Sequence, residues 1–303
     1  MEVVKQRSAS HELSVMRSLN TRTDLSDDEK NHYFKLEKGY QGEVMFDQLT
    51  AEIQNDILVI NDLCLEFSNT IFQIDTLIIS PKNIYLFEIK NYKGDYIYES
   101  ENFKLVLSKK EILNPLSQLN RCRNLLQELL RCLHIQLPLE GYLVFINPEF
   151  TLYQAPLNEQ IIYPTQLNHL MNTLNQKPSK LTDWHRKIAI QLISMHHLKN
   201  PNAKIPRYEY GLLKKGPICS HCFSFMSFDG DKKAFCEKCD YEEHIDSAIL
   251  RSVEELKLLF PDKKITTNLV YDWCGGIGSM KKIGRILKQN YQMLGFGQWT
   301  YYE

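Results

Sequence analysis

The sequence predicts an α/β protein that carries a small cysteine-rich module and a helical C-terminal segment. Three short β-rich runs lie between two stretches of helical periodicity, and four of the eight cysteines fall between Cys219 and Cys239. Hydrophobic residues make up 43% and charged residues 24%, which are values typical of globular proteins. At ~100–200 residues per domain, the 303 residues predict two domains or one domain with smaller appendages.

The overall charge does not indicate the class of binding partner. Lys and Arg number 36 and Asp and Glu number 37, so the net charge is −1 and any surface for nucleic acid must be local. No apolar run reaches the ~18 residues of a membrane-spanning helix, and residues 1–7 lack the apolar core of a secretory signal. Clustered cysteines in such a chain indicate metal binding in a reducing compartment, so we expect a cytoplasmic protein without membrane contact.

The first elements are a polar N-terminal extension and the start of an α/β domain. The extension covers residues 1–38, and helical periodicity follows from Val44 to Ile53. Three apolar runs then predict strands, at residues 57–60, 72–79 and 84–90. Pro81 and Asn83 favour a turn, which makes the second and third strands a hairpin.

A long helix and a buried strand are predicted to complete this domain. Asn114-Pro115 has the form of an N-cap followed by proline in the first turn, and an apolar stripe extends from there to Leu133. Residues 141–146 form the predicted strand. Two further runs are expected to continue the sheet, at residues 95–98 and 103–107. The expected core, residues 39–150, therefore has the order helix, three strands, helix, strand.

Three segments follow in the expected domain organisation. They are a helical linker region, a cysteine-rich module and a helical C-terminal module, at residues 151–204, 205–247 and 248–303. Helical periodicity spans residues 166–198 of the linker region, and Asn200-Pro201 and Ile205-Pro206 break it.

Charged residues interrupt the apolar pattern of the predicted hairpin. Glu88 and Lys90 are two apart in a strand and therefore project from the same face. Asp75 of the preceding strand can lie beside Glu88, and two adjacent carboxylates repel unless a divalent cation lies between them. Lys90 can hold the attacking water or stabilise charge on a phosphoryl oxygen, and Glu43 can complete or orient the metal shell.

These residue types fit phosphodiester hydrolysis assisted by Mg²⁺ or Mn²⁺. The alternative for Glu88 and Lys90 is an ordinary solvated ion pair on an edge strand. Three features favour the metal site over this alternative. They are the aspartate one strand earlier, the glutamate on the preceding helix and the apolar flanking residues.

Three motifs in this region resemble those of the nuclease-related domain (NERD) family and occur in the same order. They are Gly39–Glu43, Gln73–Ile79 and Phe87–Gly94, and the resemblance covers roughly residues 39–150. The family is similar to the PD-(D/E)xK nuclease superfamily, so the resemblance implies a restriction-endonuclease-like core. It also implies the site positions Glu43, Asp75, Glu88, Lys90 and, in the helix after the sheet, Gln118. For Gln118, a polar residue on the exposed flank of that helix is an equal alternative.

The clustered cysteines have the spacing of a zinc ribbon. They form two C-x₂-C pairs with thirteen residues between them: Cys219, Cys222, Cys236 and Cys239. Four thiolates leave no open position on a tetrahedral Zn²⁺, so we expect a structural site whose metal supplies the folding energy of the module. A redox pair and chance spacing are the alternatives. His221 and His244 are expected to be bystanders, because four cysteines suffice.

The C-terminal module is expected to contain three helices and a small hairpin. The helices are predicted at residues 252–259, 268–273 and 279–291, and the hairpin at 295–302. This order resembles a winged helix-turn-helix, and the alternative is a helical cap with a solvated basic face. Four residues of the third helix are candidates for binding phosphates: Lys281, Lys282, Arg285 and Lys288. Trp299, Tyr301 and Tyr302 are expected to form the core of the module rather than to stack on bases.

These features together predict a metal-dependent nuclease that acts on DNA. Mg²⁺ or Mn²⁺ is the expected catalytic cofactor and Zn²⁺ the structural one, and RNA stays open as a substrate. The alternative is a non-catalytic protein that binds nucleic acid or a protein partner through the zinc ribbon and the C-terminal module. Metal-dependent cleavage of DNA separates the two.

Overall fold

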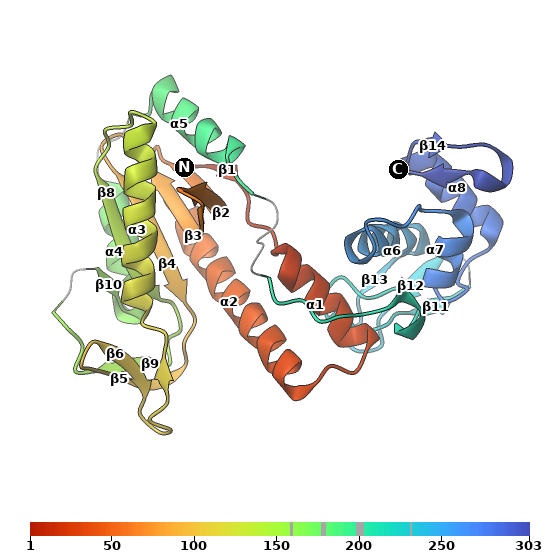
Figure 1. Cartoon of the computed structure of the whole chain (residues 1–303), viewed down its shortest axis with the longest axis horizontal. Helices are drawn as coiled ribbons and strands as arrows, with labels where there is room; N and C mark the ends of the chain where they lie inside the picture. Colours follow the sequence, from red (N-terminus) through yellow and green to blue (C-terminus); the bar gives the residue numbers. More distant parts are fainter. Residues whose placement is uncertain (158–159, 177–179, 198–202, 231) are drawn as a thin grey trace. The chain divides into compact units, whose positions relative to one another are not determined.

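The computed structural model describes residues 1–157, 160–176, 180–197, 203–230 and 232–303 (Figure 1). The chain divides into two compact units. The first unit comprises Met1–Ala9 and Lys35–Pro201, and the second comprises Ser10–Phe34 and Asn202–Glu303. The extension expected at residues 1–38 is therefore shared, because its beginning belongs to the first unit and most of its remainder to the second.

A six-stranded mixed sheet forms the centre of the first unit, in the order β1-β2-β3-β4-β8-β10. The strands are β1 (Glu2–Lys5), β2 (Leu58–Phe67), β3 (Thr70–Ile79), β4 (Ile84–Lys90), β8 (Leu139–Phe145) and β10 (Ile161–Ile162). β2, β3 and β4 run antiparallel in succession, so the expected hairpin is present as β3 and β4. β1 pairs in parallel with β2, β8 with β4, and β10 with β8.

Helices cover both faces of this sheet and make three layers (Figure 1). α3 (Pro115–Cys132) and α5 (Asp183–Ser194) pack on one face, where residues such as Leu119 and Leu192 join the main core. α2 (Asp27–Ala51) and α4 (Leu167–Gln176) pack on the other face through residues such as Phe46 and Leu170. A 3₁₀ turn, η1 (Pro164–Gln166), precedes α4. Strands covered on both faces are apolar on both faces, which explains the near-continuous apolar sequence of β3 and β4.

Four further strands form a second sheet and do not continue the first. The order is β7-β6-β5-β9, made by β5 (Gly94–Glu99), β6 (Asn102–Leu105), β7 (Glu111–Ile112) and β9 (Phe150–Tyr153). The expectation that residues 95–98 and 103–107 extend the main sheet is therefore wrong. Gly94 has a φ of 97°, a conformation open to glycine, and it redirects the chain after β4 so that β5 pairs with β9. Apolar alternation predicts a strand but does not specify its partner.

The second unit contains a small antiparallel sheet and a set of helices. The sheet consists of β11 (Ser227–Asp229), β12 (Lys233–Phe235) and β13 (Glu242–His244). The helices are α1 (His11–Arg22), α6 (Ile245–Leu259), α7 (Thr267–Trp273) and α8 (Met280–Asn290), with the short turns η2 (Tyr210–Leu212) and η3 (Gly297–Trp299). Arg22 is fully buried and donates from Nη2 to Glu255 at 2.6 Å, and its guanidinium lies 4.0 Å from the ring centre of Trp273. These contacts join α1, α6 and α7 in one core.

A hairpin follows the three C-terminal helices, as expected. It consists of β14 (Met293–Leu294) and β15 (Tyr301–Tyr302), which are antiparallel. Ile265, between α6 and α7, forms a bridge with Tyr302 and so lies on the other side of β15 from β14.

Candidate active site and zinc site

The candidate active site lies where β3 and β4 stop pairing. Their ladder ends at the pair Thr76–Phe87, although both strands continue beyond it. Asp75 and Glu88 are the next residues, so both carboxylates lie at this fork. Asp75 Oδ2 accepts a hydrogen bond from the backbone N–H of Ile89 at 2.7 Å. The side chain thus satisfies a buried donor and holds the two strands together where the ladder is missing.

Glu88 and Lys90 share one face of β4, as expected, and Gln118 of α3 reaches the same lysine. Lys90 Nζ donates to Glu88 Oε1 at 2.5 Å and to Gln118 Oε1 at 3.1 Å. The expected N-cap positions Gln118, because Asn114 Oδ1 accepts from the backbone N–H of Leu116 at 2.9 Å and starts α3 there. Gln118 is exposed and therefore lies at the opening of the site.

The carboxyl groups at the fork are buried, and this raises their pKa values. Glu88 is 2% exposed and Asp75 is 9% exposed. Burial, and then repulsion from Asp75, raises the pKa of Glu88 to about 7, and burial also raises the pKa of Asp75. Burial alone would lower the pKa of Lys90, but Glu88 and Asp75 together raise it above its ordinary value, so Lys90 stays protonated.

Glu43 comes to the fork because Gly42 lets α2 approach the end of β4. A Cβ on Gly42 would lie 2.5 Å from the Cβ of Asn91, a distance that side chains do not adopt. Asn91 directly follows Lys90, and its Nδ2 donates to the carbonyl of Lys38 in α2 at 2.9 Å. The second glycine of the first motif thus allows the helix to place Glu43 beside the site.

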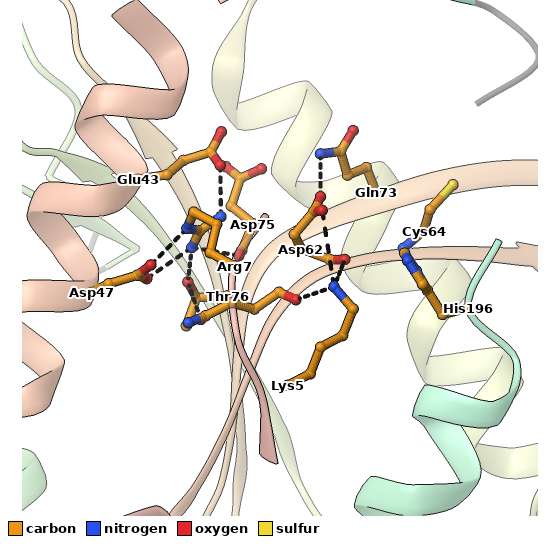
Figure 2. Close-up of polar contacts among 11 residues, drawn as sticks. Lys5, Arg7, Glu43, Asp47, Asp62, Cys64, Gln73, Asp75, Thr76 and His196 are labelled. Atoms are coloured by element: carbon orange, nitrogen blue, oxygen red, sulfur yellow. Dashed lines mark hydrogen bonds and ion pairs between the residues drawn. The ribbon is translucent and has the colours of Figure 1, made fainter. Parts of the chain in front are cut away.

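Two basic residues of the N-terminal segment complete the site, although no motif indicated them (Figure 2). Arg7 Nη1 donates to Glu43 Oε2 at 2.6 Å, and its Nε and Nη2 donate to the carboxylate of Asp47 at 2.8 and 2.9 Å. Lys5 of β1 donates to the carbonyl of Asp62 at 2.8 Å. The four residues of β1 are too few for a periodic signal, and Glu43 lies 36 positions after Arg7. The sequence alone therefore offered no means to find either residue.

Acidic groups outnumber basic groups by two in this cluster. The five acidic residues are Glu43, Asp47, Asp62, Asp75 and Glu88, and the three basic residues are Lys5, Arg7 and Lys90. With every group ionised the cluster carries a charge of −2, which one divalent cation neutralises. Burial, and then the charge of Asp75, raises the pKa of Glu43 to about 8.

The donor set fits Mg²⁺ or Mn²⁺, because carboxylate oxygens are the ligands that such hard cations prefer. The side chain of Glu43 is 19% exposed, so the cluster is reachable from solvent. Among the described residues, no three acidic side chains converge as tightly as the cysteines of the second unit. Asp75 and Glu88 would therefore hold an ion together with water and phosphate oxygens, as Mg²⁺ sites commonly do.

The four cysteines of the second unit converge on one point. Their Sγ atoms all lie within 4.8 Å of one another. Cys219 and Cys239 are 3.7 Å apart, and Cys222 and Cys236 are 3.3 Å apart. Zn–S bonds of about 2.3 Å in a tetrahedron require sulfur separations of about 3.8 Å, so small shifts suffice to enclose one ion. The cluster is compatible with a zinc ribbon, with β11 and β12 between the two cysteine pairs.

The histidines near this cluster have other contacts. The ring of His221 lies 3.9 Å from the ring of Tyr241. His244 Nδ1 accepts from the backbone N–H of Asp246 at 3.3 Å and caps α6. This cap starts α6 at Ile245, earlier than residue 252 where the helix was expected.

The four candidate phosphate-binding residues of α8 differ in their surroundings. Lys282 is 14% exposed and lies 3.1 Å from Asp246, and Arg285 lies 3.8 Å from the same carboxylate. The aspartate at the start of α6 therefore neutralises part of the charge of these two candidates for binding phosphates. Lys281 and Lys288 are exposed, and neither has an ion pair among the described residues.

The aromatic residues of the hairpin divide into two groups. Tyr302 is 3% exposed and packs as expected, and Tyr301 is half-buried beneath the ammonium of Lys264. Trp299 is 76% exposed, so the expectation that it forms part of the core is wrong. It lies in η3, after Gly295, whose φ of 80° and close approach to the carbonyl of residue 299 leave no space for a side chain.

Comparison with known proteins gives a family match for part of the first unit. Residues 38–146 match the family model of the nuclease-related domain, and this range includes β2, β3, β4, α3, β8 and the fork. No curated protein and no solved structure matches the chain. None of the described helices is long and apolar enough to cross a membrane. The chain therefore contains a nuclease-related domain, and its cysteine cluster is compatible with a C-terminal zinc ribbon.

Proposed function

We propose that the protein is a nuclease that uses Mg²⁺ or Mn²⁺ to hydrolyse phosphodiester bonds of DNA. The observation that carries this proposal is the pair of buried carboxylates at the fork, Asp75 and Glu88, with the ammonium of Lys90 beside them. Burying two adjacent carboxylates is costly unless a cation compensates them. We further propose that the protein acts in the cytoplasm, where the zinc-ribbon thiolates stay reduced.

Each residue at the fork has a distinct role in this proposal. Asp75 and Glu88 hold the ion, which when bound polarises the phosphoryl group and lowers the pKa of a water molecule. Lys90 stays charged and stabilises the negative charge that develops on the phosphoryl oxygens. Gln118 orients the ammonium of Lys90 from the opening of the site, and Glu43 orients the metal shell from α2.

The C-terminal module is the proposed DNA-holding part. The bridge between Ile265 and Tyr302 adds a third short strand segment to the hairpin, and this supports the proposal that the module is a winged helix. Lys281 and Lys288 supply exposed positive charge for phosphates. The same residues favour the second candidate function, a protein that binds nucleic acid without cutting it.

One set of assays separates these functions. Purified protein is incubated with supercoiled, linear, single-stranded and branched DNA and with RNA, in Mg²⁺, Mn²⁺ or EDTA. We expect cleavage in either metal and none in EDTA, and we expect the isosteric variant Glu88→Gln to lose it while staying folded. Lys90→Ala should lower the rate by about 10²–10³-fold, as removal of one charge-stabilising donor does elsewhere.

A matched control is Glu128→Gln, which changes an exposed carboxylate of α3 that pairs with Arg131 at the surface. It should cleave at the wild-type rate. Equal cleavage by Glu88→Gln and wild type would refute the site. If the wild-type protein binds DNA without added metal and does not cleave it, the result would favour the second candidate function, binding without cleavage.

A further inference from the structure

Arg7 lies outside the segment that matches the nuclease-related domain, yet its side chain is among the most enclosed charged groups of the first unit. The side chain is 3% exposed. It follows β1, which joins the edge of the main sheet through parallel pairing with β2. Residues 1–9 form part of the first unit, whereas the next 25 residues, Ser10–Phe34, belong to the second.

The guanidinium of Arg7 bonds to α2 and to β3 at the same time (Figure 2). On α2 it donates two parallel hydrogen bonds to Asp47 and one to Glu43. On β3 its Nη2 donates to the carbonyl of Asp75 at 2.9 Å and to Thr76 Oγ1 at 2.9 Å. Only the planar, five-donor group of arginine can satisfy partners on two elements in this way.

The contacts exceed what attachment of the N-terminal segment requires. The bidentate pair with Asp47 already compensates the buried charge, because it is the strongest geometry for an arginine–carboxylate pair. The two other partners, Glu43 and the backbone of Asp75, are the residues that approach the fork from the helix and from the strand. Arg7 therefore fixes the distance between them.

We propose that Arg7 is a positioning residue of the nuclease site, so that a segment preceding the matched domain is needed for catalysis. This inference rests on the proposed function. Arg7 is too enclosed to contact a phosphate and acts through Glu43 and Asp75. It holds one oxygen of the Glu43 carboxylate and the main chain of Asp75, which keeps the Asp75 carboxylate at the fork.

Arg7 affects metal binding in two opposite ways, through its positive charge and through the contacts that position Glu43 and Asp75, and the two effects must be measured separately. Loss of a cation from an acidic cluster increases its attraction for a divalent ion, whereas loss of the guanidinium contacts releases Glu43 and Asp75. Arg7→Lys keeps the charge and removes the fork-shaped donor, so it isolates the positional effect. Arg7→Met removes both.

The experiment measures full-length wild type, Arg7→Lys, Arg7→Met and a control at a temperature where all are folded. The control is Arg186→Met, which breaks the exposed contact between α5 and Glu2 of β1 and leaves the fork untouched. Binding of Mn²⁺ alone and the shape of its spectrum are followed by electron paramagnetic resonance, and kcat and KM are measured on linear DNA.

We expect Arg7→Lys to lower kcat by about 10–100-fold with little change in KM, since misplacement of about 1 Å can cost a factor of this size. We also expect an altered Mn²⁺ spectrum, and wild-type behaviour for Arg186→Met. Wild-type kcat and spectrum in folded Arg7→Lys would overturn the role of Arg7, even where Arg7→Met does not fold. Wild-type protein that neither binds Mn²⁺ nor cleaves DNA would instead refute the proposed function.

Discussion

Adding one methyl group at Gly42 should disturb both the fold of the first unit and its site. Gly42 and Gly39 lie three positions apart in the same helix, and both occur in the first motif. A Cβ at residue 42 would meet Asn91 Cβ at 2.5 Å and Ile146 Cγ2 at 3.2 Å. A Cβ at residue 39 would have no atom within 4 Å. The two substitutions to alanine are therefore matched in chemistry and differ in their surroundings.

The expected change in the stability of each variant follows from two opposing contributions. Alanine in a helix interior is favoured over glycine by about 0.5–1 kcal/mol, and this gain is common to both variants. Overpacking in a close-packed interior costs about 1–3 kcal/mol, and this cost applies only at residue 42. We therefore expect Gly39→Ala to stabilise the first unit and Gly42→Ala to be about 1–3 kcal/mol less stable than Gly39→Ala.

Amide hydrogen exchange of a β4 peptide measures this difference in the full-length chain, where unfolding of two units need not be a single transition. The expected difference corresponds to about 5- to 150-fold faster exchange in Gly42→Ala than in Gly39→Ala. Because Gly42 precedes Glu43, we also expect slower DNA cleavage in Gly42→Ala alone. Equal exchange and equal cleavage in the two variants would refute the close approach of α2 to β4.

Three further predictions concern protons, zinc and salt. In EDTA, the free energy of unfolding of the first unit should fall as pH rises from about 5 to 8. Glu88 and Glu43 have pKa values of about 7 and 8 in the folded protein, above the ordinary 4.5. The folded protein therefore binds more protons than the unfolded one over this range and loses that advantage as pH rises. Thermal unfolding checks this, and a rise in midpoint over that range would contradict it. Elemental analysis should give one equivalent of zinc in wild type. Cys236→Ser should lose this zinc and become sensitive to protease between residues 205 and 247, and full retention of zinc would remove the assignment. Lys281→Ala combined with Lys288→Ala should weaken DNA binding and reduce the slope of log affinity against log salt by about 2, as measured by fluorescence anisotropy. An unchanged slope would favour the alternative, a helical cap with a solvated basic face.

The sequence predicted the fork residues because their local pattern is unusual. Asp75, Glu88 and Lys90 interrupt runs of β-branched and aromatic residues, and a carboxylate in such a run requires a partner. Strand periodicity then placed Glu88 and Lys90 on one face, which the hydrogen bond between them confirms. The helix that carries Gln118 was predictable for a similar reason, since Asn114-Pro115 is a local start signal.

The strand predicted at residues 57–60 shows where the local sequence pattern was insufficient. It was expected to end at Ile60, yet β2 continues to Phe67. Asn61 and Asp62 disfavour strands, but Asp62 adopts a φ of 54° inside β2. This irregularity shifts the apolar pattern by one position, so that Leu63 faces the same core as Ile60. Only pairing with the full length of β3 shows that the strand continues.

Partners far apart in sequence account for the remaining differences. The charge of Lys282 is partly neutralised by Asp246, which lies on another helix. The partners of Arg7 lie 36 to 69 positions later in the chain. Neither contact has a local signal, because each depends on which elements the fold brings together.

The distribution of ion pairs around the fork leaves the carboxylate of Asp75 without a cationic partner of its own. Lys90 is bonded to Glu88, and Arg7 is bonded to Glu43 and Asp47, so each cation has an acidic partner of its own. Asp75 lies between them, and among the described residues its carboxylate has a hydrogen bond to a backbone N–H but no ion pair. A backbone donor supplies only a partial charge, so the neighbouring cations lower the pKa of Asp75 without offsetting its burial. A divalent ion bound by this carboxylate would supply that partner, whereas Glu43 already has an ion pair with Arg7, and this is the reason for placing the metal between Asp75 and Glu88 rather than beside Glu43.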